Sequence, residues 1–252
     1  MFIPISPKDR EIINSVINEF FSMVGEDWNF YIDYESSYLE ELVNCIPGCS
    51  LYIGATKMVI VIDNCDFVIK IPFYGQQTYD SNSDEYVYED FLHANNGYNN
   101  WDYCLTETNI YNMAIKEGVE EFFPETYEYQ EGYSIFPPVY IQKKMMLWED
   151  SGYEYESEQE KYDAIVTIEK TFHSIFSFCG NTYDHIPPYI FIYICLSYYG
   201  EDETLKLLYF IKRHNDIIND LHGNNIGVRN DGSPIIFDFS GFREIIRNKE
   251  LI

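Results

Sequence analysis

The stretch from residue 218 to residue 242, INDLHGNNIGVRNDGSPIIFDFSGF, contains the most informative pattern in the chain. Asn225 follows Asp220 by five positions, and Asp238 follows Asn225 by thirteen. Two short apolar runs flank the turn sequence Asn-Asp-Gly between them, which is a strong signal for a β-hairpin. Such a hairpin would bring Asn225, just before one strand, close to Asp238, just after the other. Because Mg²⁺ prefers carboxylate and amide oxygens, these residues are candidates for a metal site.

The composition indicates a globular protein with little affinity for polyanions such as nucleic acid. The chain has 252 residues, of which 46% are hydrophobic and 18% aromatic, enough to form a buried core. Its formal net charge of −26 disfavours a general affinity for nucleic acid or anionic membranes, because phosphate groups are bound by Lys and Arg. The same charge favours a basic protein partner.

The cysteines and the N-terminus favour a cytoplasmic protein. The six cysteines form no CxxC pair, so we expect free thiols in a reducing compartment. The first residues, MFIPISPKDR, lack the long apolar segment of a signal peptide. The longest apolar run, PPYIFIYICLSYYG, is too short to span a bilayer and predicts a buried helix instead.

The first half of the chain is predicted to begin with a helix and continue as strands. Ser6 is suited to cap the helix, and Pro7 to occupy its first position. Three β-branched runs, at residues 50–54, 57–63 and 66–73, predict three antiparallel strands.

The next segments mix loop, helix and strand signals. Residues 74–90 are polar and rich in turn-forming residues, so we expect an exposed loop there. A helix is predicted for residues 106–118, with Thr106 as a possible cap and Gly118 at its end. Residues 133–147 predict one or two further strands.

After the acidic stretch WEDSGYEYESEQE the pattern becomes helical. Residues 161–176, 189–199 and 202–215 have the period and length of helices. We therefore expect an α+β protein, with a β-rich part at residues 1–146 and a helical part at residues 147–252.

Three short motifs occur in a fixed order: FVIK, which ends at Lys70, then DLHGNN, which begins at Asp220, then DFSG, which begins at Asp238. They resemble motifs of the protein-kinase-like fold, namely the strand with the phosphate-binding lysine, the catalytic loop and the metal-binding Asp-Phe-Gly. The resemblance extends over residues 45–242. The His of DLHGNN is closer to small-molecule phosphotransferases and other atypical kinases than to standard protein kinases.

The resemblance implies a two-lobed kinase-like fold, with a β-rich N-terminal lobe and a truncated helical C-terminal lobe. It also implies transfer of the ATP γ-phosphate to a protein or small-molecule hydroxyl. Asn225 and Asp238 would hold Mg²⁺, and Asp220 would orient the hydroxyl or accept its proton. Lys70 would bind the α- and β-phosphates, with Glu107 as its ion-pair partner.

Parts of the family pattern are weak in this chain. Glu89 lies nearer than Glu107 to Lys70 in the sequence and is the alternative partner. GCSLYIGATKM supplies Gly48 and Gly54 without the three-glycine spacing of the family, so we expect Gly54 to give only reduced backbone contact to phosphates.

The sequence after the metal motif is short for this family. Only fourteen residues follow Asp238, without an Ala-Pro-Glu segment and with almost none of the usual helical substrate platform. Regulation through a phosphorylated activation segment is therefore not expected.

A non-catalytic interaction protein on a kinase scaffold is the alternative. Between residues 71 and 142 the sequence has one Lys or Arg, Lys116, and thirteen Asp and Glu. A surface of one sign would bind a basic protein partner.

Overall fold

The computed structural model describes residues 3–24, 37–54, 57–73, 75–80, 83, 85–90, 102–132, 136–147, 159, 162–163, 166–168, 170–172, 186–214 and 225–238. The chain divides into two compact units, and each consists of two chain segments. Unit 1 comprises Met1–Thr108 and Thr126–Lys143, and unit 2 comprises Asn109–Glu125 and Lys144–Ile252. Helices and antiparallel strands are both present, so the predicted α+β class is confirmed.

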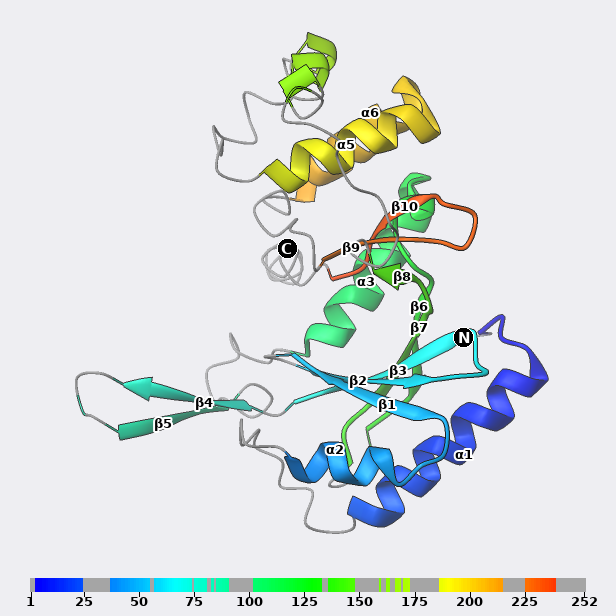
Figure 1. Ribbon diagram of the computed structural model, residues 1–252, viewed down its shortest axis with the longest axis vertical. Coiled ribbons are helices and arrows are strands. Elements are labelled where there is room, and N and C mark those ends of the chain that lie inside the picture. Colours follow the sequence, from blue (N-terminus) through cyan, green and yellow to red (C-terminus); the bar gives the residue numbers. More distant parts are fainter. Residues whose placement is uncertain are drawn as a thin grey trace. The chain divides into compact units, whose positions relative to one another are not determined.

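Unit 1 contains a five-stranded antiparallel sheet, with its strands in the order β1-β2-β3-β7-β6 (Figure 1). The strands are β1 (Cys49–Ile53), β2 (Lys57–Ile62), β3 (Phe67–Pro72), β6 (Thr126–Gln130) and β7 (Val139–Lys143). The first three are the antiparallel strands that the sequence predicts. They form because each is a run of β-branched and apolar residues bounded by polar turns.

One face of this sheet is apolar and carries the core of unit 1. Side chains alternate between the two faces along each strand, and residues opposite one another in the register share a face. Helices α1 (Pro7–Val24) and α2 (Ser37–Asn44) supply the other side of the core. Buried members of this core include Ile13, Phe20, Val43, Met58, Ile60, Ile69, Ile71 and Ile141.

The start of α1 agrees with the sequence prediction. Pro7 is its first residue, and the Asp9 N–H donates to the Ser6 hydroxyl oxygen at 3.0 Å. The Ser6 hydroxyl in turn donates to Asp9 Oδ2 at 2.7 Å, which is a reciprocal cap of the helix terminus. This hydrogen bond from Ser6 is the main cause that lowers the pKa of Asp9.

Helix α3 (Tyr103–Glu117) begins before the predicted start, because Asp102 is its cap. Asp102 Oδ1 accepts a hydrogen bond from the Leu105 N–H at 2.9 Å. The prediction of Thr106 as the cap is wrong: Thr106 lies in the first turn, where its hydroxyl donates to the Asp102 carbonyl at 3.2 Å. The predicted end is confirmed, because Gly118 follows the helix with φ of +70°, a conformation that favours glycine.

The expectation of an exposed loop at residues 74–90 is wrong. Strands β4 (Gly75–Asp80) and β5 (Glu85–Asp90) pair antiparallel as a two-stranded sheet of their own (Figure 1). The physical reason is the tyrosines and valine of β5, residue types that favour strands even when the flanking sequence is polar.

Unit 2 combines helices with a small sheet. Its strands, in the order β10-β9-β8, are β8 (Met146–Leu147), β9 (Ile226–Val228) and β10 (Pro234–Ile236). Its helical elements include η2 (Glu120–Phe122), α5 (Ile186–Tyr199) and α6 (Glu201–His214). The apolar run predicted to be a buried helix is α5, which buries Phe191, Ile192 and Cys195.

Two further observations concern the part of the chain that is described. None of its helices is both long enough and apolar enough to cross a membrane. Cys45, Cys49, Cys104 and Cys195 are free thiols, as predicted for them.

Candidate functional site

Lys70 lies in the middle of the sheet of unit 1, on the face opposite the apolar core. It is opposite Val59 of β2 and Tyr140 of β7 in the strand register. Its side chain is only 4% exposed. A buried ammonium group is costly unless a carboxylate compensates its charge.

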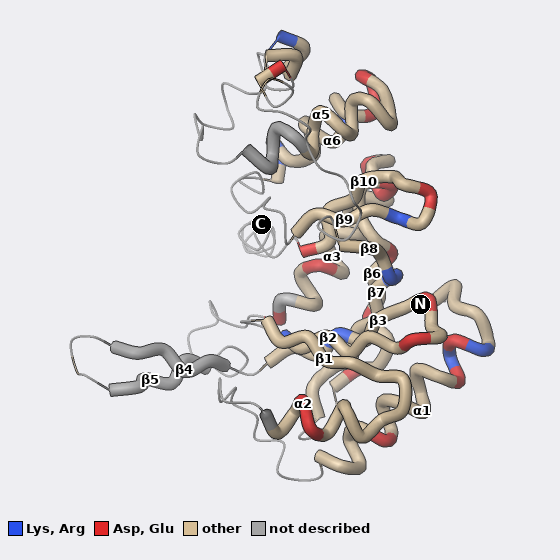
Figure 2. Tube along the Cα trace, viewed as in Figure 1, with Lys and Arg blue, Asp and Glu red and all other residues tan. Residues whose placement is uncertain are grey.

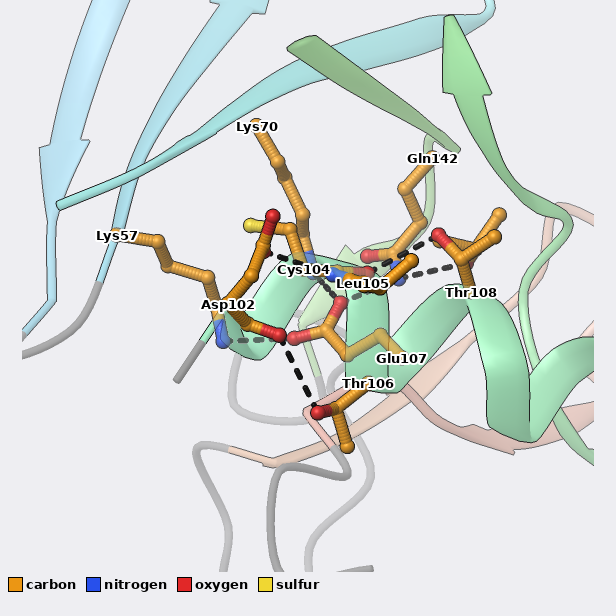
Figure 3. Close-up of polar contacts among 10 residues, drawn as sticks. Lys57, Lys70, Asp102, Cys104, Leu105, Thr106, Glu107, Thr108 and Gln142 are labelled. Carbon is orange, nitrogen blue, oxygen red and sulfur yellow. Dashed lines mark hydrogen bonds and ion pairs between the residues drawn. The ribbon is translucent and has the colours of Figure 1, made fainter. Parts of the chain in front are cut away.

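Glu107 of α3 supplies that carboxylate, as the sequence predicts. Its side chain is fully buried, and its Oε2 lies 2.5 Å from Lys70 Nζ (Figure 3). The predicted Lys70–Glu107 ion pair is therefore present. Glu89, the alternative partner, lies on β5.

A second lysine, which sequence reasoning missed, binds the same carboxylate. Lys57 Nζ lies 2.6 Å from Glu107 Oε1, and the Lys57 side chain is 7% exposed (Figure 3). Lys57 is the first residue of β2, two positions before Val59, the partner of Lys70, so both lysines project from the same face. In the sequence, Lys57 is only a lysine that begins an apolar run. The strand register decides which residues its side chain lies beside.

Two neutral side chains complete the network around Glu107. Gln142 of β7 donates to Glu107 Oε2 at 3.3 Å and to the Thr126 hydroxyl at 3.0 Å. Gln142 and Thr126 are opposite each other in the β6–β7 register and both are buried. Glu107 is thus held by three strands, and its rotamer is fixed by hydrogen bonds to each of its oxygens.

The first turn of α3 lies beside this network (Figure 3). The Tyr140 hydroxyl donates to Asp102 Oδ2 at 2.6 Å. Burial raises the pKa of the Asp102 carboxyl, and burial together with Asp102 raises the pKa of the Tyr140 phenol. Burial also raises the pKa of the Cys104 thiol well above its usual value, which keeps it protonated and a poor nucleophile.

The predicted hairpin near the C-terminus is confirmed and is formed by β9 and β10. Val228 is opposite Pro234, and Gly232 has φ of +85° in the turn between the strands. At the open end the Asn225 carbonyl accepts a hydrogen bond from the Phe237 N–H at 3.1 Å. The backbone therefore brings Asn225 next to the residue that precedes Asp238.

Arg229 connects this hairpin by hydrogen bonds to the segment that follows α3. The sequence does not predict this role. Its guanidinium donates to the carbonyls of Glu121 at 2.6 Å and Phe123 at 2.9 Å. The Tyr199 hydroxyl lies 3.2 Å from the carbonyls of Glu121 and Pro234. These bonds fix the hairpin within unit 2 through buried backbone groups.

The other predicted site residues contribute less. Gly54 follows β1, and its N–H donates to the Lys57 carbonyl at 2.9 Å, which closes the β1–β2 turn. A Cβ atom at Gly54 would meet only that carbonyl oxygen, at an ordinary 3.5 Å, so the turn does not require glycine. Asp220 lies outside the described residues.

The structure thus brings one predicted pair into contact and places the backbone of another two predicted residues near the same end of a hairpin. Lys70 and Glu107 form an ion pair in unit 1, and in unit 2 Asn225 is hydrogen-bonded through its backbone to Phe237, the residue before Asp238. No protein-family model matches the chain, and no curated protein matches it. Its function is therefore inferred from the arrangement of its own residues.

Proposed function

We propose that the chain is a compact, kinase-like phosphotransferase that moves the γ-phosphate of ATP to a hydroxyl group of a protein or a small molecule. The observation that carries this proposal is the buried Lys70–Glu107 ion pair. It joins β3, the third strand of the five-stranded sheet along the chain, to α3, the next helix in the chain. Protein kinases need an ion pair of this kind, between a strand lysine and a helix glutamate, for activity.

Lys70 would provide positive charge for the nucleotide phosphates. Phosphoryl transfer depends mainly on positioning and on stabilising negative charge. Glu107 holds the Lys70 side chain in one rotamer, so the ammonium group needs no reordering when a phosphate arrives. Burial strengthens its attraction for a phosphate oxygen, since Coulomb energies increase as the effective dielectric falls.

The hairpin of unit 2 would hold the metal ion. Asn225 and Asp238 offer an amide oxygen and a carboxylate, which suit Mg²⁺, and the backbone bond between Asn225 and Phe237, the residue before Asp238, supports this assignment. Bound Mg²⁺ would neutralise charge on the β- and γ-phosphates. This matters in a chain where 42 Asp and Glu outnumber 16 Lys and Arg and where acidic residues occur in both units (Figure 2).

Asp220 would act on the phosphate acceptor. It precedes Asn225 by five positions, the spacing of the catalytic loop in the family that the chain resembles. In this role Asp220 orients the attacking hydroxyl group and takes its proton as the new phosphate ester forms.

Calorimetric titration with ATP, with and without Mg²⁺, tests the proposal. We expect the full chain to bind ATP in the presence of Mg²⁺ and to lose most of that affinity in EDTA. The Lys70→Met variant should bind at least about tenfold more weakly, as expected for a lost charged hydrogen bond. A wild-type chain that binds no nucleotide would refute the proposal.

A second candidate function is supported by the charge distribution. The stretch from residue 71 to residue 142 has thirteen acidic residues and one Lys or Arg. A chain that binds no nucleotide but binds polylysine, with an affinity that falls steeply with salt, would be a non-catalytic binder of basic proteins.

A further inference from the structure

We infer that the outer edge of β1 (Cys49–Ile53) is a docking site for an extended segment of a partner protein, rich in lysine or arginine, which pairs with β1 as an additional strand. β1 comes first in the strand order β1-β2-β3-β7-β6, so it lies at one edge of the sheet of unit 1 (Figure 1). In the part of the chain that the structure describes, β2 is its only paired strand. This inference goes beyond phosphoryl transfer and does not depend on it.

The hydrogen bonds at the two ends of β1 show how it is bonded to β2. In an antiparallel pair, opposite residues alternate between hydrogen-bonded and non-hydrogen-bonded positions. Just before β1, the Gly48 carbonyl accepts from the Asp63 N–H at 2.9 Å. Just after it, the Gly54 N–H donates to the Lys57 carbonyl at 2.9 Å. The even-numbered residues of β1 therefore bond to β2.

The odd-numbered residues of β1 have their backbone groups on the outer side. Ser50 and Tyr52 lie at the hydrogen-bonded positions opposite β2. The N–H and C=O groups of Leu51 and Ile53 therefore point away from β2, toward the open edge. Within the described residues, these groups form no backbone hydrogen bond. They are the donors and acceptors that an added strand uses.

The side chains of β1 leave apolar surface at the same edge. Leu51 lies opposite Ile60 and is only partly buried against the core of unit 1. Ile53 is 40% exposed, and Tyr52, on the other face of the sheet, is 60% exposed. Proteins commonly protect an edge strand with a lysine, a proline or a bulge. The strand CSLYI has no charged residue and no proline, and its register with β2 is continuous.

The charges around β1 favour a basic partner. Asp63 is exposed, and its Oδ2 lies 3.5 Å from the position of a Cβ atom at Gly48, so this carboxylate is at the start of β1. Glu40 and Glu41 are exposed on α2, which packs against β1. The sequence from residue 11 to residue 56 has eight Asp and Glu and no Lys or Arg. The net charge of −26 opposes pairing between two copies of the chain.

Calorimetric titration of the full chain with a synthetic peptide of alternating lysine and valine tests the inference. We expect binding that weakens with salt, and no measurable binding of the matching glutamate–valine peptide. Ile53→Pro should weaken binding of the lysine peptide about tenfold or more, because proline removes an outward N–H and obstructs a pairing strand without breaking a bond to β2. Ile53→Ala is the matched control: it loses the side chain, keeps the N–H, and should lose clearly less affinity.

Hydrogen exchange of the wild-type chain is a second measurement, which needs no variant. The lysine peptide at saturation should slow exchange of the Leu51 and Ile53 amides about tenfold or more, while the Tyr52 amide, already bonded to β2, changes less.

Circular dichroism establishes that each variant is folded. Unchanged exchange at Leu51 and Ile53, or equal peptide affinity in wild type and folded Ile53→Pro, overturns the inference; neither result bears on ATP binding. Equal binding of the glutamate peptide refutes a basic partner. A wild-type dimer in sedimentation that Ile53→Pro dissociates assigns the edge to a second copy of the chain instead.

Discussion

Replacing Glu107 with glutamine removes the carboxylate that two buried lysines bind. The substitution keeps the volume of the side chain, so the packing of α3 on the sheet is retained and the change is electrostatic. Glu107 is fully buried and bonded to Lys57 at 2.6 Å, Lys70 at 2.5 Å and Gln142 at 3.3 Å. Removing one partner from a buried ion pair costs about 3–5 kcal/mol.

The expected effect is large relative to the total stability of a typical domain, which is about 5–15 kcal/mol. In a protein of this size a loss of 1 kcal/mol lowers Tm by about 2–4 °C, so Glu107→Gln should lower it by roughly 6–20 °C. Urea unfolding followed by circular dichroism gives the free energy, and a thermal scan gives Tm.

Asp66→Asn is the matched control for this measurement. Asp66 pairs with Lys143 in the same unit, but the two side chains are 71% and 40% exposed. Exposed pairs contribute at most about 1 kcal/mol, so the control should unfold close to wild type. If Glu107→Gln were as stable as Asp66→Asn, the carboxylate would not be needed to compensate the buried lysines, and the electrostatic account of this site would be wrong.

Three further predictions concern the hairpin and the catalytic loop. Asp220→Ala should slow phosphoryl transfer by about 10²–10⁴ while nucleotide affinity changes little, and unchanged transfer rates would remove Asp220 from the mechanism. Asp238→Asn should weaken Mg²⁺-dependent ATP binding more than Asp220→Ala does, because the amide lacks the charge that a hard cation favours; calorimetry with Mg²⁺ and EDTA compares the two. Arg229→Ala should lower the free energy of unfolding by about 3 kcal/mol, because two charged hydrogen bonds to backbone carbonyls are lost. Arg213→Ala, which removes a side chain that is 61% exposed, should cost under about 1 kcal/mol in the same urea titration.

The features that the sequence predicts correctly have local causes. Ser6 and Pro7 start α1 through a hydrogen bond that spans three residues. Gly118 ends α3 through its own backbone conformation, and the Asn-Asp-Gly turn closes its hairpin within a few residues. Such signals require no knowledge of the rest of the chain.

The features that the sequence does not predict depend on distant partners. Lys57 becomes a neighbour of Lys70 only in one register of β2 and β3, and its ion-pair partner Glu107 lies 50 residues away in the chain. The backbone carbonyls that accept hydrogen bonds from Arg229 lie 108 and 106 residues earlier in the chain. Neither partnership leaves a pattern in the sequence around the lysine or the arginine, because the acceptors are brought near by tertiary structure.

Local signals can also compete with one another. Asp102 and Thr106 are both good helix caps by residue type, and the choice between them was decided by the Tyr140 hydroxyl and the Leu105 N–H, which both bind Asp102.

The order of the segments along the chain has a consequence for how the protein folds. Unit 2 includes Asn109–Glu125 as well as Lys144–Ile252, and the carbonyls that Arg229 binds belong to the earlier segment. During synthesis that segment leaves the ribosome long before Arg229 is made, and β6 and β7 of unit 1 emerge between the two. Contacts of such long sequence separation slow folding, because a large loop must close before they form. A fragment that begins at residue 144 lacks the earlier segment altogether, so a single cut in the chain does not yield a complete unit 2.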